Sequence, residues 1–167
     1  MYVVVSGPPG SGKTTLAGAL ATELGLPLIA KDTIKDALVT TLGAADLAES
    51  RRLGRGAVAA VLAVAGENRG AVLDSVWHRT RAISELRALP GRVIEVFCRC
   101  EREVVRARYQ LRAATRAHYF DDQRTDDELW NDEVAEPVAG GWPVLELDTS
   151  GPVDVQAIAT QVRELLA

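Results

Sequence analysis

The sequence predicts an α/β protein in which a five-stranded parallel sheet is covered by helices on both faces. Short apolar runs that suit buried strands alternate along the whole chain with stretches of helical periodicity. Such alternation is typical of parallel sheets wound with right-handed crossovers. The 167 residues, 47% of them hydrophobic, suffice for one domain with a full core. We therefore expect residues 1–167 to form a single domain.

Strand and helix signals follow one another in the order that this fold requires. Residues 2–5 form a β-branched run and are expected to be a buried strand. A helix is expected from Gly12 to about Leu24, because its apolar residues recur at helical spacing and Gly25 follows as a stop. Further strands are expected at residues 27–30, 71–74, 92–98 and 143–147. Further helices are expected at residues 32–42, 45–65, 80–89, 101–117, 126–136 and 153–166, with a loop at residues 118–124.

Residues 7–14 carry the most specific signal in the chain. They read Gly-Pro-Pro-Gly-Ser-Gly-Lys-Thr and match the phosphate-binding pattern G-x-x-x-x-G-K-[ST] completely. Glycines allow consecutive N–H groups to turn toward phosphate oxygens, and the following helix adds its positive N-terminal end. The expected nucleotide-binding residues are Gly7, Pro9, Gly10, Ser11, Gly12, Lys13, Thr14 and Thr15. The pattern predicts ATP as the bound nucleotide and a three-layer P-loop NTPase fold.

Two residues of the loop have roles beyond binding. The Lys13 ammonium is expected on the β- and γ-phosphates, where it is also catalytic, and the Thr14 hydroxyl is expected to ligate Mg²⁺. The chain does not resemble the GTPases that act as switches. Those proteins read guanine with an Asn/Thr-Lys-x-Asp motif, and here no lysine follows Lys35 to form one.

Asp32 follows the second predicted strand, at the sheet edge where ligands of such folds bind. It is a candidate for the general base that accepts the proton of an acceptor hydroxyl, and equally a plain helix cap. Lys35 lies about one helical turn further on and could hold the substrate, although a solvated lysine is an equal alternative.

Asp74 ends the third predicted strand at the same edge. Its carboxylate could order Mg²⁺ or bind the acceptor, and a structural cap is the alternative. Trp77 and His78 follow and suit an acceptor pocket, with ordinary packing as the alternative.

Arginines crowd the region from about residue 101 to residue 136, which we expect to form a helical lid. Guanidinium groups suit the spread charge of a phosphoryl group in transfer, although most of these side chains are expected to be solvated. Of Arg106, Arg108, Arg112 and Arg116, we expect Arg108 and Arg112 to be catalytic.

Taken together, these motifs resemble the small P-loop kinases grouped with AAA-family ATPases. Relatives of that group include chloramphenicol phosphotransferase, the 5′-hydroxyl polynucleotide kinase domain, gluconate kinase and zeta toxins. The resemblance implies that Asp32 is the general base, that a lid arginine comes from around residues 106–112, and that Asp148 and Thr149 lie near the adenine. An arginine often stands in such kinases where this chain has Lys35.

The expected function is transfer of the ATP γ-phosphate to a hydroxyl of a small molecule. A polynucleotide 5′-hydroxyl kinase is the close alternative, disfavoured by the net charge of −4. A regulatory ATPase without an acceptor is a second alternative. A nucleoside monophosphate kinase is a third, for which Arg51, Arg52 and Arg55 could form the second phosphate site, although solvated helix charges are the favoured interpretation of these three.

The composition and the hydrophobic pattern of the chain indicate its expected location in the cell. No membrane span or signal peptide is evident, so a cytoplasmic monomer or homodimer is expected. Cys98 and Cys100 are expected to be buried, reduced thiols.

Overall fold

A parallel sheet of five strands forms the centre of the chain in the computed structural model, which describes residues 1–113 and 120–165. The strands are β1 (Tyr2–Ser6), β2 (Leu28–Ala30), β3 (Ala71–Asp74), β4 (Val93–Arg99) and β5 (Val144–Asp148). They lie in the order β2-β3-β1-β4-β5, and every neighbouring pair is parallel. The predicted fold class is therefore confirmed, with strand ends within two residues of those expected.

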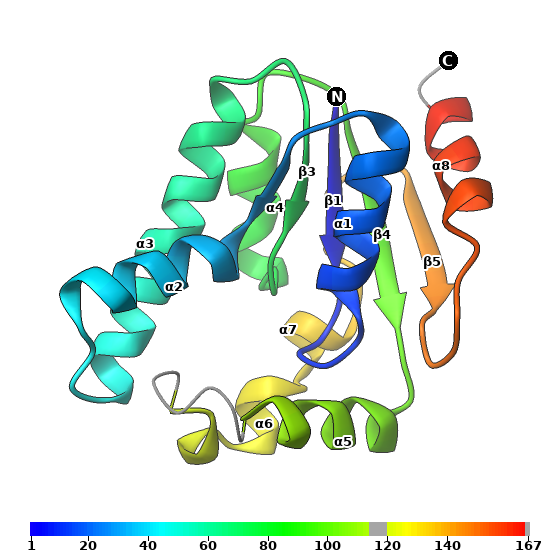
Figure 1. Cartoon of the computed structure of the whole chain (residues 1–167). Coiled ribbons are helices and arrows are strands. Elements are labelled where there is room, and N and C mark those ends of the chain that lie inside the picture. The colour runs from blue at the N-terminus through cyan, green and yellow to red at the C-terminus, as the bar shows by residue number, and fades with distance from the viewer. Residues whose placement is uncertain (114–119, 166–167) are drawn as a thin grey trace.

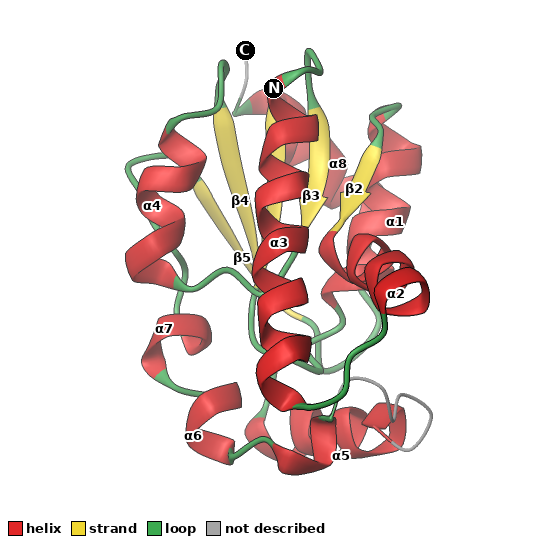
Figure 2. Ribbon diagram, turned by 90° about the vertical axis from the view of Figure 1, so that its left-hand side faces the viewer, coloured by secondary structure: helices red, strands yellow, loops and turns green. Residues whose placement is uncertain are grey.

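Helices cover both faces of this sheet (Figures 1 and 2). They are α1 (Lys13–Leu24), α2 (Lys31–Leu42), α3 (Leu47–Gly66), α4 (Arg79–Arg87), α5 (Arg102–Ala113), α6 (Asp126–Leu129), α7 (Asp132–Ala135) and α8 (Val155–Glu164), with a 3₁₀ helix η2 at Asp121–Gln123. Within the described residues, none of these helices combines the length and the apolar character that a membrane span needs.

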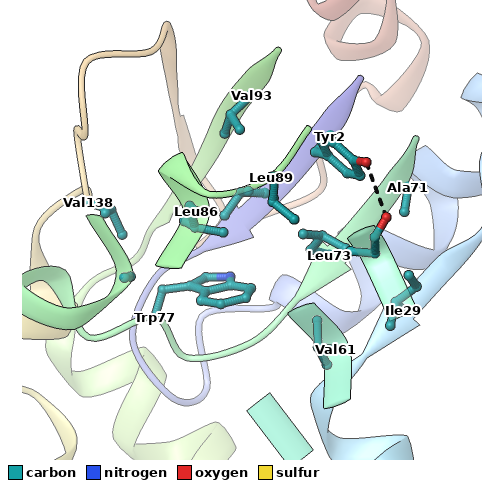
Figure 3. Close-up of a cluster of buried hydrophobic side chains, with 13 residues drawn as sticks. Tyr2, Ile29, Val61, Ala71, Leu73, Trp77, Leu86, Leu89, Val93 and Val138 are labelled. Atoms are coloured by element: carbon teal, nitrogen blue, oxygen red, sulfur yellow. Dashed lines mark hydrogen bonds between the residues drawn. The ribbon is translucent and has the colours of Figure 1, made fainter. Parts of the chain in front are cut away.

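The core consists of two clusters, one on each face of the sheet. One cluster joins the sheet to α3 and α4 through side chains such as Val61 and Leu86, and Figure 3 shows it from within. The other joins the sheet to α1 and α8 through side chains such as Leu20 and Ile158. Strand residues alternate between them, since Val4 faces the first cluster and Val3 faces the second. This produces the three predicted layers.

The observed helices differ from the predicted ones at two places. Helix α2 begins at Lys31, so Asp32 lies in its first turn and does not cap it. The helix expected at residues 126–136 is two short helices, because Asn131 caps a new one with its side chain. Helix α5 is described to Ala113, so residues 114–117 of the expected helix lie outside the described part, as does Leu166 of the closing helix.

The segment that contains α5, α6 and α7 lies across the ends of the strands, beyond their arrowheads in Figure 1. Parallel strands of such folds present ligand sites at this edge. The arginine-rich segment therefore faces the loops that follow β1, β2 and β3, where the site residues were expected. Of the residues expected to be loop at 118–124, η2 takes up 121–123, whereas 118 and 119 lie outside the described residues.

Candidate active site

The phosphate loop connects β1 to α1 and depends on its glycines. Gly7, Gly10 and Gly12 have φ angles of 131°, 86° and 89°, in the region that favours glycine. A Cβ on Gly10 would lie 2.4 Å from the carbonyl oxygen of Val105 in α5. The first turn of α1 receives no side-chain cap, so its N–H groups can bind an anion such as a phosphate. The loop thus fits the nucleotide for which its sequence is typical.

Lys13 is buried, and its ammonium donates a hydrogen bond of 2.8 Å to the carbonyl of Pro8 in the same loop. Burial lowers the pKa of this lysine, whereas the nearby Asp74 carboxylate raises it. An ammonium on a loop carbonyl within a desolvated site has a strong preference for a phosphate oxygen. A bound nucleotide would therefore offer the Lys13 ammonium a phosphate oxygen in place of the Pro8 carbonyl.

Asp74 lies beside Lys13 and Thr14 at the end of β3. Its side chain is almost fully buried, and burial raises its pKa, whereas Lys13 and a hydrogen bond with the Thr14 side chain lower it. Asp74 is paired in the sheet with Ala30, and Asp32 follows two residues after that strand end. The structure therefore brings four predicted site residues together: Lys13, Thr14, Asp32 and Asp74.

Asp32 is partly exposed and accepts a hydrogen bond of 2.9 Å from the Lys31 ammonium. It lines a cavity of about 450 Å³, a size usual for small-molecule sites. The cavity is enclosed by the phosphate loop, α2, α3, α4 and the arginine-rich segment. Its lining residues are Pro9, Lys31, Asp32, Lys35, Ser50, Arg51, Gly54, Arg55, Val58, Ala59, Val76, His78, Arg81, Glu85, Tyr109, Arg112, Asp121, Arg124, Glu128 and Leu129. We refer to it as the acceptor cavity.

Lys35 is buried between α2 and α3, which the residues around it in the sequence do not predict. It is 1% exposed, and its ammonium donates a hydrogen bond of 2.8 Å to the Ser50 hydroxyl on α3. Burial, together with the Lys31 and Arg124 cations, lowers its pKa to about 8. The alternative of a solvated lysine is therefore wrong.

The structure separates Trp77 from its neighbour His78. Trp77 is 3% exposed and packs in the core cluster of α3 and α4, as Figure 3 shows, so it does not line the acceptor cavity. Its apolar ring is stabilised there by the strands and helices that surround it. His78 lines the cavity.

A second cavity of about 180 Å³ adjoins the phosphate loop. It is lined by Gly10, Gly12, Lys13, Thr14, Thr15, Arg108 and Arg112. Arg112 lines both cavities, so this residue lies between the phosphate loop and the acceptor cavity. Arg108 instead donates hydrogen bonds of 2.9 Å to the carbonyls of Thr149 and Ser150.

Aromatic side chains connect the arginine-rich segment to the phosphate loop. The Trp130 indole donates a hydrogen bond of 3.1 Å to the carbonyl of Pro9. The Tyr109 ring meets the Trp130 ring edge-on, and the Arg112 guanidinium lies 5.7 Å from the Tyr109 ring centre. Arg106 pairs with Asp126 outside both cavities, and Arg116 lies outside the described residues.

Thr149 contacts the phosphate loop at Ser11. Its hydroxyl lies 2.7 Å from the carbonyl oxygen of Ser11 and 2.9 Å from that of Arg99. Asp148 is exposed and accepts a hydrogen bond from the Ser150 amide. This turn is the region in which the adenine was expected.

Cys98 is buried and Cys100 partly buried, and both are free thiols. Burial raises the pKa of Cys98 to about 12, so this thiol stays protonated. Among the described residues, no group of three His, Cys, Asp or Glu side chains converges as a metal site of their own would require.

Sequence reasoning missed one residue that supports this site and left another undecided. Arg55 was offered as part of a second phosphate site but expected to be a solvated helix charge; the structure leaves it exposed and places it on the acceptor cavity. Glu95 was not singled out, and its buried carboxylate accepts a hydrogen bond from Ser6, at the end of the strand that leads into the phosphate loop. A lone carboxylate inside the apolar run Val93–Phe97 was an available signal, because a buried charge needs partners.

Comparisons with known proteins agree with this geometry. A family model described as an AAA domain matches residues 3–136. The solved structure of a candidate kinase from Chloroflexus aurantiacus is 29% identical, with a TM-score of 0.87 over 99% of this chain and 98% of that one. Kti12 from Chaetomium thermophilum, solved with ADP-AlF3, is 21% identical with a TM-score of 0.68 over 100% of both chains, which shows a shared fold.

A curated sequence relative matches a shorter stretch. Cytidylate kinase from Ignicoccus hospitalis is 49% identical over 41 residues, which are 25% of this chain and 24% of that protein. The aligned stretch therefore spans about a quarter of this relative.

Proposed function

The chain belongs to the AAA domain family and has the fold of small P-loop kinases, and from this premise we propose that it transfers the γ-phosphate of ATP to a hydroxyl group of a small molecule. The observation that carries the proposal is the position of Arg112 between the phosphate loop and the acceptor cavity. A kinase needs a phosphate site and an acceptor site that meet at the transferring group. A P-loop ATPase without an acceptor has no need of the second site.

Each side of this junction has residues that suit its task. On the phosphate side, Lys13 leaves the Pro8 carbonyl for the β- and γ-phosphates. Thr14 and Asp74 adjoin one another there and fit an Mg²⁺ ion bound by a hydroxyl, a carboxylate and phosphate oxygens. When bound, Mg²⁺ neutralises charge on the β- and γ-phosphates.

On the acceptor side, Asp32 orients the acceptor hydroxyl and takes its proton as the oxygen attacks the γ-phosphorus. The bond from phosphorus to the β,γ-bridging oxygen breaks on the opposite side, and ADP leaves. Arg112 stabilises the spread charge of the phosphoryl group between the two. The arginine-rich segment acts as a lid that excludes water, which would otherwise hydrolyse ATP.

The test is ADP release across a panel of hydroxyl compounds that includes nucleosides, sugars, aminoglycosides, chloramphenicol and a 5′-hydroxyl oligonucleotide. We expect Asp32→Asn to lower acceptor-dependent turnover by about 10²–10⁴-fold and to leave ATP binding intact. Asp36→Asn is the matched control, since Asp36 is exposed on the same helix outside the acceptor cavity.

Other outcomes distinguish the alternatives. Slow ATP hydrolysis that ignores every acceptor and survives Asp32→Asn would contradict the proposal and favour a regulatory ATPase. Turnover confined to the oligonucleotide, and steeply dependent on salt, would favour the polynucleotide kinase.

A further inference from the structure

The acceptor cavity carries more positive charge than the protein around it. Of its lining residues that the structure describes, seven are cationic and four are acidic, an excess of three positive charges, whereas the whole chain has a net charge of −4. The cations are Lys31, Lys35, Arg51, Arg55, Arg81, Arg112 and Arg124. A cleft with one sign of charge favours a ligand of the opposite sign.

The four acidic residues are already matched by cations of the same cavity. Lys31 pairs with Asp32 at 2.9 Å. Arg51 pairs with Glu128 at 2.7 Å, at the mouth between α3 and α6. Arg124 pairs with Glu128 at 2.9 Å, with Asp121 at 3.7 Å, and Arg81 approaches Glu85 at 4.0 Å. Each of the four acids is thus matched by a lining cation, and the described lining keeps its excess of three positive charges.

Arg55 lines the cavity from α3 and is exposed to solvent. Among the described residues it makes no ion pair or hydrogen bond, so its guanidinium is open to a ligand. Lys35 faces the same cavity from α2 and is buried, with its ammonium on the Ser50 hydroxyl. A buried ammonium attracts an anionic ligand more strongly than an exposed one does, because less water screens the two charges.

Gly54 of α3 lies beside the side chains of Lys31 and Lys35. A Cβ on Gly54 would lie 3.9 Å from the stems of both Lys31 and Lys35, so α2 and α3 approach closely at this point. Arg55 is the next residue of α3. Asp32 and Lys35 are three residues apart, about 4.5 Å along the axis of α2. A proton acceptor and a set of anion-binding cations therefore lie within the span of one small molecule.

We propose that the acceptor is a small anionic hydroxyl compound whose carboxylate or phosphate group is bound by Arg55 of α3 and Lys35 of α2. This inference rests on the proposed kinase function, because only a kinase requires the bound compound to be a phosphoryl acceptor with a hydroxyl group. The anion site itself is a property of the cavity and can be measured without turnover. It makes Arg55 a specificity-determining residue.

Calorimetric titration with matched pairs of probes tests the proposal. The protein is first saturated with ADP and Mg²⁺, so that the phosphate loop is occupied. The pairs are gluconate with glucose, glucose 6-phosphate with glucose, and cytidine 5′-monophosphate with cytidine, which separate a carboxylate from a phosphate. We expect an anionic member of at least one pair to bind about tenfold or more tightly than its neutral partner.

Arg55→Gln should abolish most of this advantage, whereas Arg52→Gln should preserve it. Arg52 is an exposed arginine of the same helix that does not line the cavity, so the two variants lose the same charge from the same element. Lys35→Met should reduce the advantage as well. Retained binding of ADP shows that each variant is folded.

Two results would overturn the inference. One is that no pair shows an anionic advantage, and the other is an advantage that survives Arg55→Gln. If no pair shows an anionic advantage, yet a neutral compound is phosphorylated when ATP replaces ADP, the kinase proposal holds and the anion site falls. If an anionic probe binds through Arg55 without acceptor-dependent ADP release from ATP, the anion site holds and the kinase proposal falls.

Discussion

The carboxylate of Glu95 accepts a hydrogen bond of 2.6 Å from the hydroxyl of Ser6, the residue that precedes the phosphate loop. Glu95 is fully buried, and the same carboxylate accepts hydrogen bonds from the amides of Val138 and Ala139 and from the indole of Trp142. Four donors thus satisfy the oxygens of this carboxylate, and no cation pairs with it among the described residues. The arrangement ties the chain that follows α7 to the strand that carries the loop.

Replacing this carboxylate by an amide should destabilise the whole fold. Glu95→Gln places an NH₂ group against two of the donors, so we expect a loss of about 2–4 kcal/mol of unfolding free energy. Chemical denaturation measures it. Glu146→Gln is the control, because Glu146 is half exposed and its pairing with Arg99 is a surface contact worth about 1 kcal/mol or less. Equal effects of the two changes would contradict the assigned role of Glu95.

Arg108 and Arg112 should have separable effects on catalysis. Arg112 lies between the two cavities, so we expect Arg112→Ala to lower kcat by about 10²–10³-fold. Arg108 holds the carbonyls of Thr149 and Ser150, so Arg108→Ala should raise KM for ATP and affect kcat less. Steady-state kinetics with the preferred acceptor measures both.

Arg102→Ala, at the exposed start of the same helix, is the control for a change of charge. An Arg108 variant that loses kcat as severely as Arg112→Ala would give both arginines a catalytic role, as the sequence had predicted.

The sequence predicted those parts of the site that local chemistry determines. The phosphate loop is a contiguous motif between a strand and a helix, and Asp32 and Asp74 follow strands whose ends must share an edge of the sheet. Side chains whose place depends on helix packing could not be found in this way. Lys35 is buried because α3 places Ser50 and Gly54 against it, and Trp77 turns into the core while its neighbour His78 faces the cavity.

Charge alone could not distinguish the arginines of α3 from one another. Arg51, Arg52 and Arg55 are close together in sequence, yet only the first and the last line the acceptor cavity, since the helical repeat turns Arg52 away. Sequence shows three equivalent arginines, and the tertiary contact between α2 and α3 makes them different.

The buried ammonium of Lys35 should make stability depend on pH. Its pKa in the folded protein is about 8, below the ordinary lysine value of 10.5. Between these values the unfolded chain binds the proton and the folded chain releases it, so folding stability rises with pH in that window. Below pH 8 the cost of the buried charge is fully present. The groups that set this pKa besides burial are Lys31, Arg124, Asp32 and Asp121.

The measurement is the difference in unfolding free energy between the wild type and Lys35→Met, taken from pH 6 to pH 10.5. We expect a constant difference below about pH 7 and a relative gain for the wild type above pH 8. A difference that stays constant throughout would show that Lys35 keeps its ordinary pKa in the folded protein.

Gly10 should tolerate no side chain, because it meets the arginine-rich segment through backbone atoms. Its φ angle of 86° costs other residues about 1–2 kcal/mol, and its Cβ would lie 2.4 Å from the carbonyl oxygen of Val105. Backbone cannot move aside as a flexible side chain does, so Gly10→Ala must displace either the loop or α5. We expect both lower stability and an increase of about tenfold or more in the Kd for ATP, since displaced N–H groups lose their phosphate contacts.

The chain offers a matched control for this substitution in Gly18. That glycine lies inside α1, and its Cβ would meet no atom within 4 Å. Gly18→Ala should raise the unfolding free energy by about 0.5–1 kcal/mol, because alanine favours the helix, and leave the Kd for ATP unchanged. Thermal unfolding and nucleotide titration of the two variants side by side measure both effects. An ATP affinity that survives Gly10→Ala would mean that the contact between the loop and Val105 can open without cost to nucleotide binding.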